Sequence, residues 1–187
     1  MHPWHDVALG SGVPEMFPVL VEVPMGSKHK DALDKATGLM RVDRVRFSAV
    51  HSPSNYGVIP QTSAEDHDPL DVLVLGQEPV VPLALLTAKA SGLMQMRDQG
   101  ERADKIIAGH VHDPDYAHYN SIFELPAHRM LKSNASSRIT RLWKIKPLSW
   151  EISLIGQRHW RVLRKRSNAT GSIDIHLCTL TGKTEHK

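Results

Sequence analysis

The sequence predicts a mainly β fold, either a barrel or a sandwich, and two observations lead to this prediction. Short stretches of alternating or clustered apolar residues recur throughout residues 1–130 of the 187-residue chain. Gly, Pro, Asn and Asp stand between these stretches, as expected of turns that connect short strands. The length of the chain suits one domain with a sizeable buried core.

The first strands are predicted from the alternation of apolar and polar residues. Residues 19–24 (VLVEVP) alternate loosely and are rich in residues that favour strands, so we expect a strand there. Residues 35–38 (KATG) are typical of a turn. Residues 41–47 (RVDRVRF) alternate more regularly and predict a second strand.

The later strands are predicted from short apolar runs. Residues 70–75 (LDVLVL) form such a run between turn signals, which indicates a buried strand. A proline in the run LPAHR favours the start of a helix. The other expected elements are strands over 55–60, 84–96 (with a break at Gly92) and 105–111, and this helix, which starts at Pro126 within the run 125–129.

The chain changes character near residue 131, where we place the boundary between a barrel domain (1–130) and a basic tail (131–187). The domain contains 11 Lys and Arg against 17 Asp and Glu, whereas the tail contains 12 against 3. The tail also holds three of the four tryptophans and no Phe or Tyr. We expect the tail to be disordered, or to derive from a frameshift, a retained intron or an alternative exon.

Cysteine usage and apolar content indicate the compartment. The single cysteine, Cys178, has no partner for an internal disulfide, which favours a reducing environment. The N-terminus lacks the basic and apolar segments of a signal peptide, and no apolar run is long enough to span a bilayer. We therefore expect a cytoplasmic protein with no membrane partner.

Three aspartates, Asp66, Asp68 and Asp71, lie close together at the start of the predicted strand over 70–75. Carboxylates this close repel one another, and cations, protonation or water must relieve the repulsion. Hard divalent ions such as Mg2+ prefer oxygen ligands, so the cluster is a candidate metal site. An acidic surface turn has the same composition, whereas an EF-hand is excluded because its glycine and terminal glutamate are missing.

Further acids and several cations favour the metal site over the surface turn. Asp98 and Asp104 again place acids beside a turn and a strand, with Lys105 next to them. Glu22 lies between two valines of the first predicted strand. Metal-binding acids together with separate cations are typical of a site that handles phosphate. The cations near the first strands are Lys28, Lys30 and Arg44.

Taken in order, these motifs resemble those of the family I soluble inorganic pyrophosphatases, in particular the eukaryotic and plant-type members. The resemblance covers about residues 2–130. It implies an OB-like five-stranded barrel flanked by helices (an α+β fold), dependence on Mg2+, and hydrolysis of inorganic pyrophosphate to two phosphates. The motifs are Glu22-Val23-Pro24, Lys28-x-Lys30, Val42-Asp43-Arg44, Asn55-Tyr56-Gly57, Asp66-x-Asp68-Pro69-x-Asp71 and Asp98…Lys105.

The resemblance also implies a role for each candidate residue. Asp68 would activate the attacking water, and Glu22 would shape the metal shell. The implied metal ligands are Asp66, Asp71 and Asp98, and the implied phosphate-binding residues are Lys30, Arg44, Tyr56 and Lys105.

The chain departs from the family pattern at several positions around the predicted site. Ala32 stands where the family has a glutamate, and Ala103 stands where it has a metal-ligand aspartate. Asp104 is adjacent to Ala103, but a shift of one residue along a strand turns a side chain to the other face. Ser52 and His67 replace a tyrosine and a glycine. The family's C-terminal Tyr-Lys pair has no equivalent in the tail.

Three functions follow from these observations. The first is Mg2+-dependent hydrolysis of pyrophosphate, with activity intact or reduced. The second is an inactive pyrophosphatase-like protein that binds metal and phosphate or joins active homologues as a subunit. The sequence is also compatible with a homo-oligomer. The third is a nucleic-acid-binding barrel, suggested by Arg164-Lys165-Arg166 and the tail tryptophans, although the acidic domain opposes nucleic acid.

Overall fold

The structure is a computed structural model that describes residues 1–13, 15–47, 49, 51–62, 68–95, 97–98, 101–102, 104–126 and 144–146. For residues 95, 97–98, 101–102 and 144–146 it describes the backbone alone. Residues 127–129 of the run in which a helix is expected to start, and nearly all of the predicted tail, lie outside the described residues.

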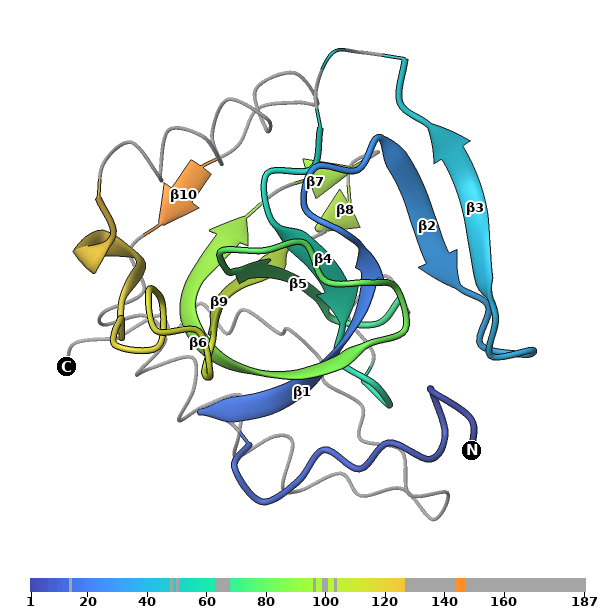
Figure 1. Ribbon diagram of the computed structural model, residues 1–187, viewed down its shortest axis with the longest axis horizontal. Helices are drawn as coiled ribbons and strands as arrows, with labels where there is room; N and C mark the ends of the chain where they lie inside the picture. The colour runs from blue at the N-terminus through green and yellow to red at the C-terminus, as the bar shows by residue number, and fades with distance from the viewer. Residues whose placement is uncertain are drawn as a thin grey trace, which may run out of the picture.

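Five strands close into a barrel, which Figure 1 shows nearly end-on. The strands pair in the order β1-β4-β5-β9-β6, and β6 pairs with β1 to complete the circle. All of these pairs are antiparallel except β5–β9. The predicted five-stranded barrel is therefore confirmed. Its strands are β1 (Met16–Val23), β4 (Asn55–Val58), β5 (Asp71–Leu75), β6 (Leu85–Gln95) and β9 (Lys105–His110).

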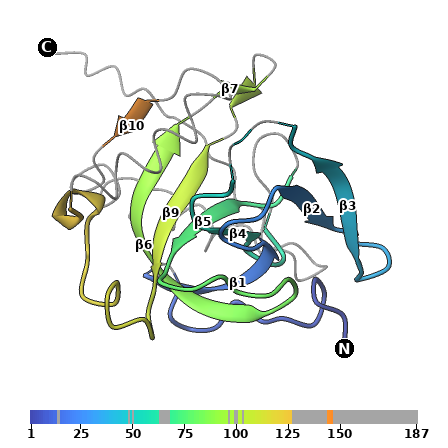
Figure 2. The same cartoon turned by 45° about the horizontal axis from the view of Figure 1, so that its top comes forward.

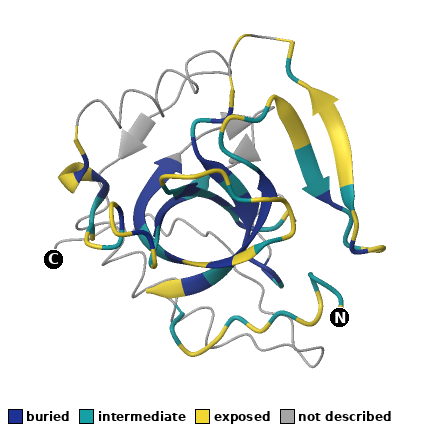
Figure 3. Ribbon diagram, viewed as in Figure 1, coloured by how far each residue is buried: buried dark blue, intermediate teal, exposed yellow. Residues whose placement is uncertain are grey.

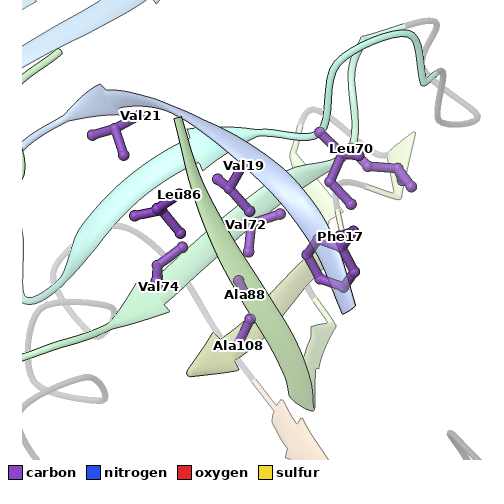
Figure 4. Packing of buried hydrophobic residues seen from close by; sticks show 10 residues of the cluster. Phe17, Val19, Val21, Leu70, Val72, Val74, Leu86, Ala88 and Ala108 are labelled. Atoms are coloured by element: carbon purple, nitrogen blue, oxygen red, sulfur yellow. The ribbon is translucent and has the colours of Figure 1, made fainter. Parts of the chain in front are cut away.

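The barrel interior is filled by apolar side chains from alternate positions of its strands. Val19 and Val21 of β1 face Val72 and Val74 of β5, as Figure 4 shows, and all four are almost completely buried. The alternation is that of a strand with one face in the core. Phe17, Ile59, Leu70, Leu86, Ala88 and Ala108 complete the cluster.

Two further strands form a hairpin that projects from the barrel beside β1 (Figures 1 and 2). They are β2 (His29–Leu33) and β3 (Met40–Val45), and we call this hairpin the arm. Every residue of β3 after Met40 is exposed, which Figure 3 shows as a yellow outer strand. Leu33 and Met40 pack with Leu20 of β1, so the base of the arm is fixed to the barrel.

Other elements differ from the expectations. The predicted break at Gly92 is wrong, because β6 continues through it with a shift of register. A Cβ on Gly92 would lie 3.1 Å from Ile122, so this glycine allows close packing. The sequence did not predict β2 or the short strands β7 (Arg97–Asp98) and β8 (Glu101–Arg102). Within the predicted tail, β10 (Lys144–Lys146) pairs with β6.

Helical structure is scarce in the part of the chain that the structure describes. There it consists of one 3-10 turn, η1 (Ile122–Glu124), capped by the Ser121 hydroxyl, so the described residues lack the expected flanking helices. No helix among them is long and apolar enough to cross a membrane.

Candidate active site

The parallel pairing of β5 with β9 brings Asp71 and Lys105 together. Val72 pairs with Ile106, so Asp71 and Lys105, which precede them, lie side by side at the starts of β5 and β9. Val72 points into the barrel, which puts the side chain of Asp71 on the outer face. There the Lys105 ammonium makes an ion pair with Oδ2 of Asp71. Strand register therefore fixes a contact between residues far apart in sequence.

Tyr56 of β4 contacts the same ammonium. Nζ of Lys105 donates a hydrogen bond of 3.1 Å to the Tyr56 hydroxyl and lies 5.0 Å from the centre of its ring. Burial raises the pKa of the Tyr56 hydroxyl well above its ordinary value, and the charge of Asp71 raises it further. A hydrogen bond with Asp71 also raises this pKa, so the phenol stays protonated at neutral pH and keeps a proton that it can donate.

Glu22 enters the site because of a β-bulge in β1. Val21 pairs with Gly57 and Val23 pairs with Tyr56, so Glu22 is the extra residue between them. Its side chain is 6% exposed, and Oε1 accepts a 2.8 Å hydrogen bond from the backbone N–H of Leu33. Glu22 thus connects the barrel to the arm.

Burial raises the pKa of Glu22 to about 7, from an ordinary value of 4.5. The hydrogen bond from Leu33 opposes this shift, the charge of Asp71 adds to it, and the charges of Lys30 and Lys105 oppose it. Because Asp71 and Lys105 of the barrel and Lys30 of the arm all influence this one carboxyl group, the charges of the barrel and of the arm lie in the same region of the molecule.

Two neighbours of Tyr56 hold the start of β4 in place. A Cβ on Gly57 would lie 2.1 Å from the carbonyl oxygen of Leu20, so only glycine permits this approach of β4 to β1. The buried amide of Asn55 accepts hydrogen bonds from the N–H groups of Met25 and Val80 and donates to the carbonyl of Glu78. Sequence reasoning quoted Asn55 within a motif but gave it no role.

The arm carries the other two predicted phosphate-binding cations. Lys30 of β2 and Arg44 of β3 pair directly across the hairpin. Their side chains are 47% and 66% exposed, in contrast to 16% for Lys105. Both make ion pairs with Asp43, which sequence reasoning left without a role.

The remaining predicted acids are described to different extents. Asp68 is exposed in the segment before β5, and its charge contributes to the raised pKa of Tyr56. Asp104 is half-buried directly before β9. Asp98 lies in β7, where the backbone alone is described, and Asp66 lies outside the described residues.

The structure describes two of the four positions that depart from the family pattern. Ala32 is half-buried on β2, between Asp31 and Leu33. Ser52 is buried, and its hydroxyl donates a 2.8 Å hydrogen bond to the carbonyl of Ser54. His67 and Ala103 lie outside the described residues.

The chemistry of the side chains fits a hard divalent cation. Glu22 and Asp71 offer carboxylate oxygens, which are the ligands that such ions prefer. Among the side chains that the structure describes, no three His, Cys, Asp or Glu residues gather into a metal-binding group. The side chains of Asp66 and Asp98, which complete the predicted set, are not among them.

The chain is similar to known inorganic pyrophosphatases in sequence. The family model described as inorganic pyrophosphatase matches residues 19–136. Over 129 residues the chain is 57% identical to soluble inorganic pyrophosphatase 1 of Arabidopsis thaliana and 58% identical to a soluble inorganic pyrophosphatase of Zea mays. These matches cover 69% of this chain but only 61% and 60% of the relatives.

Solved structures agree with the sequence matches. The pyrophosphatase of Thermus thermophilus superimposes with a TM-score of 0.68 at 29% identity, covering 77% of this chain and 87% of that one. The Neisseria gonorrhoeae enzyme gives 0.70 at 26% identity, with 84% and 96% covered. The barrel, the family match and the sequence identity agree, and the chain belongs to the family of soluble inorganic pyrophosphatases, a family of metal-dependent enzymes.

Proposed function

We propose that this protein hydrolyses inorganic pyrophosphate to two phosphates and requires Mg2+. The observation that carries the proposal is the position of Lys105, whose ammonium contacts both the Tyr56 hydroxyl and the Asp71 carboxylate. Buried Glu22 shares the electrostatic environment of these groups. A cation, a protonated phenol and two carboxylates that influence each other electrostatically suit a substrate that is a dense anion held with a divalent ion.

The side chains divide the work in the following way. Lys105, Tyr56, Lys30 and Arg44 donate hydrogen bonds to phosphate oxygens and offset their negative charge. Asp68, which is exposed to solvent, accepts a proton from the water that attacks phosphorus. Because the leaving phosphate gains charge as the bond breaks, Lys105 stabilises the transition state more than the bound substrate, whereas Lys30 and Arg44 contribute mainly to binding.

Mg2+ is the metal that we propose, because the assigned ligands are all carboxylates. Asp66, Asp71 and Asp98 would hold the ions, and Glu22 would shape the surrounding shell. When bound, Mg2+ lowers the pKa of coordinated water and neutralises phosphate charge. Asp104 is not assigned as a ligand, because a shift of one residue from Ala103 changes the face on which a strand residue lies.

A second function is favoured by Ala32, which offers no carboxylate where the family has a glutamate. Ala32 and Ala103 together would leave the site without two of the family's acids. Each 1.36 kcal/mol of transition-state stabilisation that is lost lowers the rate about tenfold. The second proposal is therefore a protein that binds metal and pyrophosphate without turnover.

Phosphate release from pyrophosphate, measured with the full chain in Mg2+ and in EDTA, tests the first function. We expect release that depends on Mg2+ and that Asp68→Asn lowers strongly. Release no higher than buffer alone rules out hydrolysis. Calorimetry with pyrophosphate and Mg2+ then tests the second function, which requires binding without turnover.

A gain of function separates impaired catalysis from an unrelated defect. We expect Ala103→Asp, alone or with Ala32→Glu, to raise the rate of hydrolysis by restoring acids to the family positions. A matched control is Ala88→Asp in the barrel interior, which should unfold the protein because Ala88 is fully buried. An unchanged rate in a folded Ala103→Asp variant shows that the missing acid does not limit the chain.

The compartment and the assembly are separate proposals. A single cysteine favours a reducing compartment, and we place the protein in the cytoplasm. Expression of the full chain fused to a fluorescent protein tests this location. Light scattering on the full chain decides between a monomer and the homo-oligomer that the sequence leaves open.

A further inference from the structure

Asp43 is the extra residue of a β-bulge in the arm. Lys30 pairs with Arg44 and Asp31 pairs with Val42, so Asp43 has no residue opposite it. In a regular strand, neighbouring side chains point to opposite faces, whereas a bulge reorients them. The bulge accounts for the contact that Asp43 makes with its own neighbour, in which Nε of Arg44 donates a 2.9 Å hydrogen bond to Oδ2.

One oxygen of Asp43 contacts both cations of the arm. Oδ2 lies 2.9 Å from a terminal nitrogen of Arg44 and 3.3 Å from Nζ of Lys30. The hydrogen bond from Arg44, followed by the contact with Lys30, holds the pKa of Asp43 below its ordinary value. The carboxylate therefore remains ionised near neutral pH and stays attached to both cations.

The shared carboxylate solves a problem that two exposed cations create. Lys30 and Arg44 have long, mobile side chains, and ordering each one when an anion binds costs conformational entropy. Their positive charges also repel each other when no anion is present. A carboxylate between them offsets the repulsion and restricts both side chains before the anion arrives.

We propose that Asp43 is a positioning residue that holds Lys30 and Arg44 together for binding of pyrophosphate. This inference rests on the proposed function, because it takes these two cations as phosphate-binding groups. Asp43 need not touch the substrate; it acts through the two cations. Its loss should weaken affinity for pyrophosphate, while proton transfer to Asp68 proceeds as before.

The test compares Asp43→Asn, Asp43→Glu and the unchanged chain, all at full length with Mg2+. We expect Asp43→Asn to raise KM for pyrophosphate about three- to tenfold with kcat within about twofold, since exposed ion pairs are individually weak. Asp43→Glu keeps the charge and should return KM to within about twofold of the original. We also expect the KM of Asp43→Asn, divided by the KM of the unchanged chain, to approach one as the salt concentration rises, because screening weakens the interactions of exposed charges.

Asp34→Asn is the matched control, since Asp34 is another aspartate of the arm and makes a 3.2 Å ion pair with Arg41. It should leave KM unchanged. A KM for Asp43→Asn equal to or lower than the original overturns the inference, and so does a KM ratio insensitive to salt or a Glu variant as weak as the Asn variant.

Calorimetric binding of pyrophosphate separates this inference from the proposed function. If the unchanged chain binds pyrophosphate but does not hydrolyse it, the proposed catalysis fails, and the Asp43→Asn loss of affinity still tests the positioning role. If the unchanged chain hydrolyses pyrophosphate and Asp43→Asn binds it equally well, the positioning role alone fails.

Discussion

The two parts of the candidate site are built differently. On the barrel, Lys105 is 16% exposed and Asp71 27% exposed, and the pairing of β5 with β9 sets their positions. On the arm, Lys30 and Arg44 are about half or more exposed, and they are attached to a hairpin with an exposed outer strand. Removal of one group from the barrel part should therefore cost more than removal of one group from the arm.

The difference follows from solvent screening. Water weakens the attraction between exposed charges, so each ion pair on the arm contributes little and the pairs must act together. On the barrel, a partly buried charge that loses its partner keeps the cost of desolvation. The following changes test this contrast, beginning with the one that should have the largest effect.

Gly57→Ala should prevent closure of the barrel. Its Cβ would lie 2.1 Å from the carbonyl oxygen of Leu20, a backbone atom that cannot move without separating β1 from β4. We expect a loss of about 4 kcal/mol or more in the free energy of unfolding, measured by urea denaturation. Gly76→Ala is the control, because its nearest contact would be an ordinary 3.4 Å. Equal midpoints for the two variants contradict the prediction.

Lys105→Gln should lower kcat/KM about 10²- to 10³-fold, the range found when one preorganised donor is removed. The change leaves Asp71 and the Tyr56 hydroxyl without their shared cation. Steady-state phosphate release measures the effect. Lys89→Gln on β6 is the control, since its ammonium instead contacts the carbonyl of Ala117. A loss below about tenfold for Lys105→Gln would remove the distinction between barrel and arm.

Glu22→Gln should change how stability depends on pH. The folded pKa of about 7 lies above the ordinary 4.5, so protonated Glu22 contributes stability that is full below pH 4.5 and is lost as the pH rises to about 7. This loss amounts to about 3 kcal/mol. Glutamine does not ionise, so the variant should not lose stability between pH 4.5 and about 7 in this way. Urea denaturation at pH 4.5 and pH 8 in EDTA measures the difference, and identical pH dependences contradict the prediction.

Arg44→Gln should have the smallest effect, raising KM for pyrophosphate about tenfold or less with kcat nearly unchanged, because the guanidinium is 66% exposed. Arg41→Gln on the same strand is the control and should change KM by less than about twofold. If Arg44→Gln reduces the rate as strongly as Lys105→Gln, the arm is as important to the chemistry as the barrel.

The sequence predicted the barrel strands well because each buries one face. Alternation in 19–24 and the apolar run in 70–75 led to β1 and β5, with ends shifted by a few residues at most. It did not predict β2, whose sequence HKDAL has no β-branched residue and only one strongly apolar side chain. That strand exists because it pairs with β3 and because Leu33 packs on the barrel.

The site residues were assigned from the resemblance to a family, and their contacts were not. The structure brings Tyr56, Asp71 and Lys105 together and brings Glu22 within electrostatic range of them. Nothing in the residues around Asp43 indicated that it would contact both Lys30 and Arg44. An acid beside an arginine on a strand normally points to the opposite face, so only the bulge reveals the contact.

The sequence by itself determined the β character of the chain, the family and the set of charged residues, because local alternation and motif order are properties of the chain alone. Only the tertiary structure decided which of those charges meet. Strand register sets the contact between Asp71 and Lys105, and two β-bulges aim Glu22 and Asp43. Register and bulges depend on pairing between distant segments, which local sequence does not specify.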